Sequence, residues 1–113
     1  MKKQIVVIGL GRFGISIART LYAIGHDVLA IDSNEKTVQS IAADITHSIQ
    51  ADGTNETVLR ELGIGNFDIG IVAIGAAVES SVLSTILLKK LGVPYVIARA
   101  DNELHGSILE KIG

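Results

Sequence analysis

Apolar and polar positions alternate along the chain with two periods, one typical of strands and one typical of helices. Short runs rich in Val, Ile and Ala predict strands at residues 3–9, 26–32, 47–52, 68–75 and 95–99. Between them, apolar residues at helical spacing predict helices at 12–25, 34–44, 54–65 and 76–92, and a last helix that begins at an Asp101 or Asn102 cap. Most of these helices end in glycine, which closes a helix in the left-handed conformation.

Five strands separated by helices predict one parallel sheet with helices on both faces. The crossover between parallel strands is almost always right-handed, which restricts the possible topologies. We therefore expect one α/β domain over residues 1–113, doubly wound, with strand order 3-2-1-4-5, or 3-2-1-4-5-6 where a sixth strand follows. The sequence ends at ILEKIG without a polar tail, so we also expect that a C-terminal lobe of a longer protein is absent.

The composition fits this fold and excludes several functions. Apolar residues make up 48% of the chain and aromatic residues only 4%, which is typical of a parallel sheet buried on both faces. There is no cysteine, which excludes disulfides and thiolate chemistry. A net charge of −2 argues against a nucleic-acid surface or an anionic-membrane surface. The apolar run in MKKQIVVIGLG is soon broken by glycines, so we interpret it as the first strand of a cytoplasmic protein and not as a signal peptide. No apolar stretch approaches the roughly 20 residues of a membrane helix, so any work at a membrane would need a membrane-spanning partner.

The sequence GLGRFG follows the first predicted strand and has the spacing of a phosphate-binding loop. Gly9 allows a sharp turn, Gly11 lets the backbone approach a phosphate, and Gly14 lets the next helix pack closely on the strand. The free amides at the start of that helix then point at the anion. We expect a Rossmann-type nucleotide site in which the whole loop takes part: Gly9, Leu10, Gly11, Arg12, Phe13 and Gly14.

Asp32 ends the second predicted strand, 18 residues after Gly14. A carboxylate at this place can accept hydrogen bonds from both ribose hydroxyls of an adenosine, and its charge disfavours the 2′-phosphate of NADP. The alternative for the loop and Asp32 together is a glycine turn and a helix-capping Asp that hold no ligand.

Two further loops are expected at the same edge of the sheet. The carboxyl ends of parallel strands meet where open α/β sheets bind ligands, so the loops after the third and fourth strands are expected to border the adenine and ribose. The alternative is plain turn chemistry, with Asp52 only capping a helix from Thr54. The residues concerned are Asp52, Gly53, Ile74, Gly75 and Ala76.

The sequence offers little for catalysis. A dehydrogenase needs a proton donor or acceptor near the cofactor, and His26 and His47 precede strands, at the opposite edge of the sheet. His105 lies in the first turn of the last helix, on the nucleotide side. We therefore predict a nucleotide that is sensed and not consumed, with no catalytic and no metal-binding residue. A small NAD-dependent oxidoreductase that uses His105 is one alternative, and an assembly module with a structural nucleotide is another.

Two arginines are candidates for the phosphate end of the nucleotide. Arg12 lies in the glycine loop and Arg99 ends the fifth predicted strand. Guanidinium groups suit multi-donor recognition of phosphate, and two of them favour the terminal phosphate of ATP or ADP over the pyrophosphate of NAD. The alternative is that both are ordinary surface arginines.

The predicted helix at 76–92 has an apolar stripe wider than one sheet face would cover, and the last predicted helix has a narrow apolar stripe that suits a partner. We expect them to form a dimer surface, with packing inside the chain as the alternative. The residues are Val78, Val82, Leu83, Ile86, Leu87, Leu88 and Leu91 in one helix and Leu104, Ile108 and Ile112 in the other.

The segments VIGLGRFG, GHDVLAID, ADGT, NFDIGIVAIGA and HGSILEKIG together resemble the N-terminal lobe of the RCK or KTN (TrkA-N) family, in particular its KtrA-type and TrkA-type subunits. The resemblance implies a cytoplasmic gating ring, built from dimers, that binds ATP, ADP or NAD(H) and controls a membrane-embedded potassium transporter. It also implies that Arg12 approaches the phosphates across a subunit boundary. Members of this family usually continue into a second lobe, so ring closure and a divalent ion at a subunit boundary stay open.

The same resemblance implies two groups of site residues beyond the loop. At the acidic end of the second strand they are Asp32, Ser33 and Asn34, and after the fifth strand they are Arg99, Ala100 and Asp101, with His105 nearby.

Overall fold

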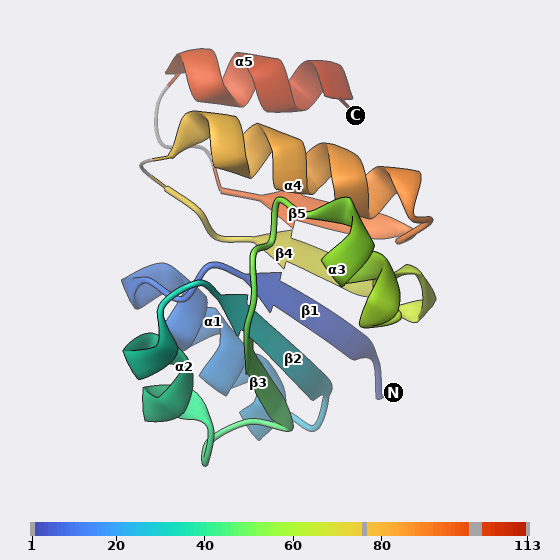
Figure 1. Ribbon diagram of the computed structural model, residues 1–113. Coiled ribbons are helices and arrows are strands. Elements are labelled where there is room, and N and C mark those ends of the chain that lie inside the picture. Colours follow the sequence, from blue (N-terminus) through green and yellow to red (C-terminus); the bar gives the residue numbers. More distant parts are fainter. Residues whose placement is uncertain (1, 76, 100–102, 113) are drawn as a thin grey trace.

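Five strands form one all-parallel sheet in the order β3-β2-β1-β4-β5 in the computed structural model, which describes residues 2–75, 77–99 and 103–112 (Figure 1). The strands are β1 (Gln4–Ile8), β2 (Asp27–Asp32), β3 (His47–Gln50), β4 (Ile69–Val72) and β5 (Tyr95–Ala98). The helices are α1 (Arg12–Ala23), α2 (Glu35–Ile41), α3 (Glu56–Glu61), the 3-10 helix η1 (Ile64–Asn66), α4 (Val78–Lys90) and α5 (Glu103–Ile112). The predicted doubly wound sheet and its strand order are confirmed, and the described residues contain no sixth strand.

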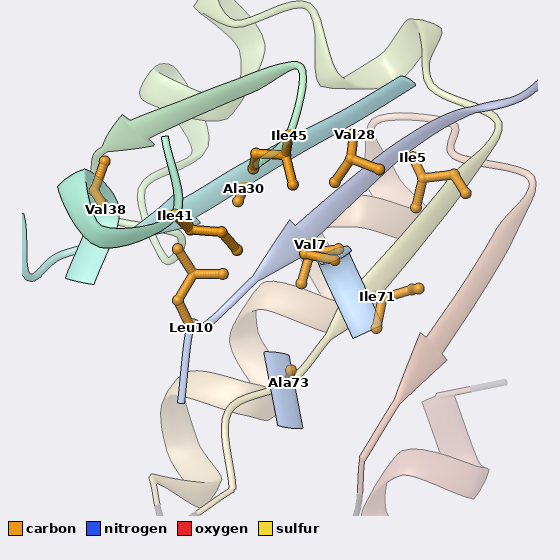
Figure 2. Packing of buried hydrophobic residues seen from close by; sticks show 11 residues of the cluster. Ile5, Val7, Leu10, Val28, Ala30, Val38, Ile41, Ile45, Ile71 and Ala73 are labelled. Carbon is orange, nitrogen blue, oxygen red and sulfur yellow. The ribbon is translucent and has the colours of Figure 1, made fainter. Parts of the chain in front are cut away.

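Strand residues alternate between two core layers, one on each face of the sheet. Ile5 and Val7 of β1 belong to the layer beneath α1 and α2, which Figure 2 shows from close by. Val6 and Ile8 belong to the opposite layer, beneath α3 and α4. Because neighbouring strand residues face opposite sides, both faces of the sheet are buried, which explains the nearly continuous apolar runs in the sequence.

The strand register brings the functional loops to one edge. Ile8 of β1 pairs with Ile31 of β2 and with Val72 of β4, and Asp32 pairs with Gln50 of β3. These strands therefore end almost level with one another. The loops that follow them begin side by side at the carboxyl edge of the sheet, the place that the sequence predicts for ligand binding.

The prediction of one helix over residues 54–65 is wrong in its bounds. Asn55 is the N-cap, and its side chain accepts a hydrogen bond from the amide of Val58 at 3.1 Å, so α3 begins at Glu56. Gly63 has a φ of 72° and ends the helical turn, after which the chain forms η1. The expected cap of the last helix at Asp101 or Asn102 lies outside the described residues.

Helices α4 and α5 lie beside one another (Figure 1), and part of the predicted dimer surface is buried within the chain. Leu87 and Leu88 belong to the core layer against the sheet, and Leu91 packs against it, so the expectation was wrong for these three residues. An apolar groove with a volume of about 580 Å³ remains open across the two helices. It is lined by Val78, Glu79, Val82, Leu83, Ile86 and Ile108.

The described part of the chain has no helix that is both long enough and apolar enough to cross a membrane.

Candidate functional site

A pocket with a volume of about 350 Å³ opens at the carboxyl edge of the sheet, between the loops that follow β1, β2, β3 and β4. Its lining includes nine of the predicted site residues, namely Gly9, Leu10, Gly11, Asp32, Ser33, Asp52, Gly53, Ile74 and Gly75. The other lining residues are Ile8, Ile31, Ala51, Thr54, Ala73, Ala77 and Ser80. The structure thus gathers four separate segments of the sequence around one cavity.

The glycine loop has the geometry that its spacing predicts. Gly9 has a φ of 98°, a conformation that favours glycine, and its amide donates to the carbonyl oxygen of Ile31 at 2.9 Å. A Cβ at Gly14 would lie 1.8 Å from the carbonyl oxygen of Gly9, so only glycine fits between the helix and the loop. A Cβ at Gly11 would meet no atom within 4 Å. The backbone at Gly11 is therefore open to a ligand.

The first turn of α1 is suited to an anion. Its N-cap is Gly11, which offers no side-chain hydrogen bond to the free amides, and the turn holds no acidic residue. Uncapped amides and the positive end of the helix dipole together favour a negatively charged group. Arg12 is the first residue of the helix and is exposed, although it does not line the pocket.

Asp32 connects the glycine loop to the end of β2. One carboxylate oxygen, Oδ2, accepts from the amide of Leu10 at 2.7 Å, and Oδ1 accepts from the amide of Asn34 at 2.8 Å. An ionised carboxylate has about four acceptor positions, so both oxygens retain capacity for ribose hydroxyls. Asn34 itself caps α2 through its side chain and is not part of the pocket lining.

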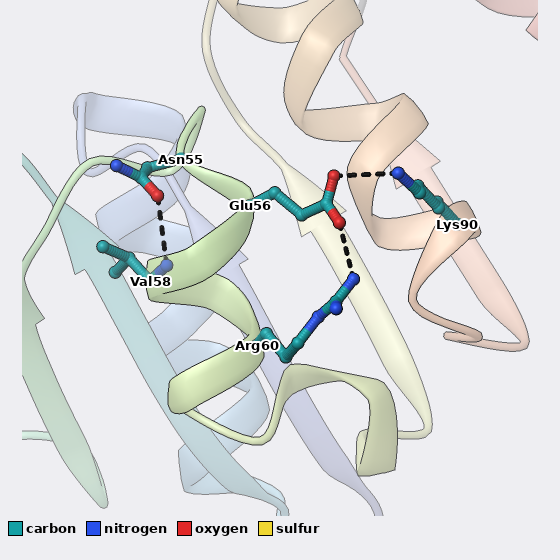
Figure 3. Close-up of polar contacts among 5 residues, drawn as sticks. All are labelled: Asn55, Glu56, Val58, Arg60 and Lys90. Atoms are coloured by element: carbon teal, nitrogen blue, oxygen red, sulfur yellow. Dashed lines mark hydrogen bonds and ion pairs between the residues drawn. The ribbon is translucent and has the colours of Figure 1, made fainter.

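Asp52 forms a local turn in the loop that follows β3. Its Oδ1 accepts from the hydroxyl of Thr54 at 2.5 Å and from the amide of Thr54 at 2.8 Å. These two hydrogen bonds, the side-chain one first, lower the pKa of the Asp52 carboxyl below its ordinary value. Asp52 is therefore a carboxylate at neutral pH. It does not cap α3, since Asn55 has that position (Figure 3).

Arg99 lies against the start of α1. Its guanidinium carbon is 5.4 Å from the centre of the Phe13 ring, the geometry of a cation–π contact. Its amide donates to the carbonyl oxygen of Val72 at 2.9 Å, which fixes the backbone at the end of β5. Phe13, Gly14 and Arg99 lie outside the pocket lining, and Ala76, Ala100 and Asp101 lie outside the described residues.

The structure does not bring His105 to the pocket. The side chain is completely buried, and its Nε2 is 2.8 Å from the hydroxyl of Ser81 on α4. The buried side of α5 faces α4, so the imidazole takes part in the contact between the two helices. His47 is exposed at the start of β3, at the edge opposite the pocket, as the sequence predicts.

Sequence reasoning missed Ala77 and Ser80, both contributed by the start of the chain's longest described helix. Their spacing of three residues places them on one side of the helix. A helix that begins at the carboxyl end of β4 must present its first turn to the ligand edge, and this signal would have found them. Across the described residues, no group of three or more His, Asp or Glu side chains is placed to hold a metal ion.

Residues 5–113 match the TrkA-N domain. The Ktr system potassium uptake protein A of Bacillus subtilis (strain 168) is 50% identical over 111 residues, which cover 98% of this chain and 50% of that protein. The chain therefore spans about half the length of the curated relatives that it matches.

Two solved structures show the same fold at low sequence identity. The TrkA-N domain of the inner membrane protein ybaL from Escherichia coli has a TM-score of 0.88 at 15% identity, covering 100% of this chain and 84% of that one. The GsuK channel bound to NAD has a TM-score of 0.83 at 16% identity, covering 100% of this chain and 20% of that one. The sheet order, the glycine loop and the match over residues 5–113 together show that this chain belongs to the TrkA-N domain family.

Proposed function

We propose that this chain binds an adenine nucleotide in the pocket at the carboxyl edge of the sheet and acts as the regulatory domain of a potassium transport system. The observation that carries the proposal is the convergence of the open Gly11 backbone, the uncapped start of α1 and the Asp32 carboxylate on one side of a single cavity. The regulatory role is supported by a relative that is named as a potassium uptake protein. Nucleotide binding is supported by a structural neighbour that was solved with NAD.

In this proposal each part of the pocket receives one part of the nucleotide. The phosphates lie at Gly9 to Gly11 and the first turn of α1, where backbone amides and the helix dipole balance their charge. The ribose hydroxyls donate to Asp32. The base and ribose are bordered by Asp52 and Gly53 on one side and by Ile74 and Gly75 on the other.

Arg12 and Arg99 extend the site toward a terminal phosphate. Both are exposed, and Arg99 is held at the start of α1 by its contact with Phe13. Two guanidinium groups beside an uncapped helix start favour ATP or ADP over NAD, because both phosphates of NAD belong to an internal pyrophosphate and neither is terminal. In this proposal, the groove across α4 and α5 is the surface through which the chain forms a homo-oligomer. Arg12 of one subunit then reaches the nucleotide of a neighbouring subunit, so that the bound nucleotide affects the arrangement of the subunits.

In this proposal, the chain acts at a membrane only through a partner. A membrane-embedded potassium transporter subunit would carry the ion, and this domain, on the cytoplasmic side, would bias its opening through a ring of dimers. We infer no chemical reaction at the nucleotide, because the imidazole of His105 is packed against Ser81 and does not line the pocket. Turnover of NADH with a carbonyl substrate, lost in His105→Ala, would instead favour an oxidoreductase.

Thermal unfolding with ATP, ADP, NAD or NADH tests the binding half of the proposal. A ligand at a hundredfold excess over its Kd stabilises the folded state by about 2.7 kcal/mol, which for a domain of this length raises the unfolding midpoint by about 10 °C. We expect such a rise with at least one of the four nucleotides. An unchanged midpoint with all four would contradict nucleotide binding.

A further inference from the structure

A buried hydroxyl on α4 holds one wall of the pocket in place. Ser84 is completely buried, and its Oγ donates a hydrogen bond of 2.7 Å to the carbonyl oxygen of Gly53. The two residues are 31 positions apart in the sequence, so this bond joins α4 to the loop between β3 and α3. Serine has a low preference for helix interiors and is seldom buried without a partner, so its place here requires a reason.

Gly53 is pressed between Ser84 and the end of β1. A Cβ at this position would lie 2.5 Å from Cγ2 of Ile8 and 3.6 Å from Oγ of Ser84. The loop backbone therefore lies directly on the floor of the pocket. At the near end of this loop, the amide of Ala51 donates to the carbonyl oxygen of Asp32 at 3.0 Å, which ties the loop to β2. The bond from Ser84 provides a second attachment, to α4.

The helical spacing places Ser84 just below the pocket. Ala77 and Ser80 line the cavity, and Ser84 follows Ser80 by one turn on the same side of α4. Ser84 is absent from the lining itself, so it has no surface to offer a ligand. Its effect on binding must pass through the backbone of Gly53.

We propose that Ser84 is a positioning residue of the nucleotide pocket, which fixes the segment from Ala51 to Thr54 so that Asp52 and Gly53 stay at the wall beside the base and ribose. This inference rests on the proposed nucleotide-binding function. Without the hydroxyl, the Gly53 carbonyl loses its donor from α4, and the loop can recover a hydrogen bond only by moving toward water. Such a movement widens the pocket beside the base and ribose, which are the parts that all adenine nucleotides have in common.

Ser81 provides a matched control on the same helix. It is also completely buried, and its Oγ lies 2.8 Å from Nε2 of His105 on α5. Ser81→Ala removes the same group from an equally buried place, but it affects the contact between α4 and α5 and leaves the bond to Gly53 intact. A general loosening of α4 would thus appear in both variants, whereas a specific effect on the pocket wall appears only in Ser84→Ala.

The experiment compares Ser84→Ala and Ser81→Ala with the unaltered chain by calorimetric titration with ATP, ADP and NAD. We expect Ser84→Ala to weaken all three by a common factor of about three- to tenfold, the value of one lost hydrogen bond. Ser81→Ala is expected to stay within about twofold of the unaltered chain. Amide hydrogen exchange without nucleotide is expected to become faster at residues 51–54 in Ser84→Ala alone.

Three results would overturn the inference. These are unchanged affinity together with unchanged exchange in Ser84→Ala, an equal loss of affinity in Ser81→Ala, and a loss confined to one nucleotide. If Ser84→Ala does not fold, Ser84→Cys keeps the size of the side chain and a weak donor, and a smaller effect in the same direction is expected. If the unaltered chain binds no adenine nucleotide, the proposed function fails, while the exchange at residues 51–54 still decides whether Ser84 fixes the loop.

Discussion

At the residue scale, the side chain of Asp32 both holds the backbone of the site in place and lines the pocket. Its two carboxylate oxygens accept the amides of Leu10 and Asn34, so the glycine loop and the turn before α2 are held by the group that is expected to bind ribose. The sequence predicts the place of Asp32 from its spacing to the glycines, because the length of the apolar run indicates where the second strand ends. It does not predict these two amide bonds, which depend on how the loop folds back.

Replacing Asp32 by Ala is expected to weaken adenine nucleotides by about 10- to 150-fold, because hydrogen bonds to a charged acceptor contribute about 1.5–3 kcal/mol. The unliganded domain also loses stability, since two amides lose their acceptor. Asp68→Ala is the matched control, because Oδ2 of Asp68 accepts the amide of Gln4 at 2.8 Å at the other edge of the sheet. Calorimetric titration should show normal affinity in Asp68→Ala, and equal losses in both variants would place the ribose elsewhere.

At the scale of elements, the glycines of the loop between β1 and α1 have two different roles. Some are needed for folding and others for nucleotide binding. Gly11→Ala places a methyl group in open space at a φ of −73°, so we expect an unchanged unfolding midpoint but a loss of nucleotide affinity of about tenfold or more. Gly14→Ala forces a Cβ against the Gly9 carbonyl and is expected to cost about 3 kcal/mol or more. Thermal unfolding and titration of both variants check this, and a stable Gly14→Ala would contradict it.

An exposed ion-pair cluster around Glu56 connects α3 to α4 (Figure 3). Its carboxylate accepts from Lys90 of α4 at 2.9 Å and from Arg60 of α3 at 2.5 Å. Lys90, the larger influence, lowers the pKa of Glu56 below its ordinary value. The resulting stability is fully present above the unfolded-state pKa and is lost as the pH falls through the lower folded-state pKa.

Glu56→Gln should therefore lower the unfolding midpoint slightly at neutral pH and at low salt. The difference from the unaltered chain should shrink below about pH 4 and vanish at lower pH, where both side chains are neutral. Glu61→Gln is the control, because Glu61 lies on the same helix and makes no ion pair with the described residues. A difference that persists at about pH 2.5 would show that packing, and not charge, is responsible.

The elements were predictable because the apolar period changes cleanly between strands and helices, whereas the direction of single side chains was not. The alternation at Ile5 to Ile8 identifies a strand buried on both faces. For His105, the pattern gives the helix and the turn, but only the packing of α5 on α4 determines that the ring meets Ser81. Ala77 and Ser80, by contrast, could have been predicted, because a helix that begins at the carboxyl end of β4 presents its first turn to the ligand edge.

At the scale of the whole molecule, the chain is one compact unit with a binding edge and an uncovered apolar groove. Its Cα radius of gyration is 12.8 Å, close to the roughly 13 Å of a single domain of this length. Leu83 and Ile86 remain 39% and 42% exposed in the groove across α4 and α5. Self-association through this groove stays a prediction, and under the proposed function nucleotide binding would act on a transporter through this self-association.

A nucleotide shifts an assembly only by its difference in affinity for two arrangements, so a sensor must contact ATP and ADP differently. Arg12 is the expected sensor, because ATP offers it a γ-phosphate that ADP lacks. Arg12→Ala should narrow the gap between ATP and ADP affinities in the assembled protein and leave adenosine recognition by Asp32 intact. Titration of both nucleotides checks this. An equal loss for both would make Arg12 a simple phosphate anchor.

The central claim is that the pocket at the carboxyl edge of the sheet binds an adenine nucleotide. It is tested most directly by following the nuclear magnetic resonance signals of the backbone amides, residue by residue, during an ATP titration. The account predicts the largest changes at Gly9 to Gly11, at Asp32 to Ser33 and at Asp52 to Thr54, with little change at the amino ends of the strands. Saturable changes centred on His47 and the opposite edge, or no changes at all, would contradict it.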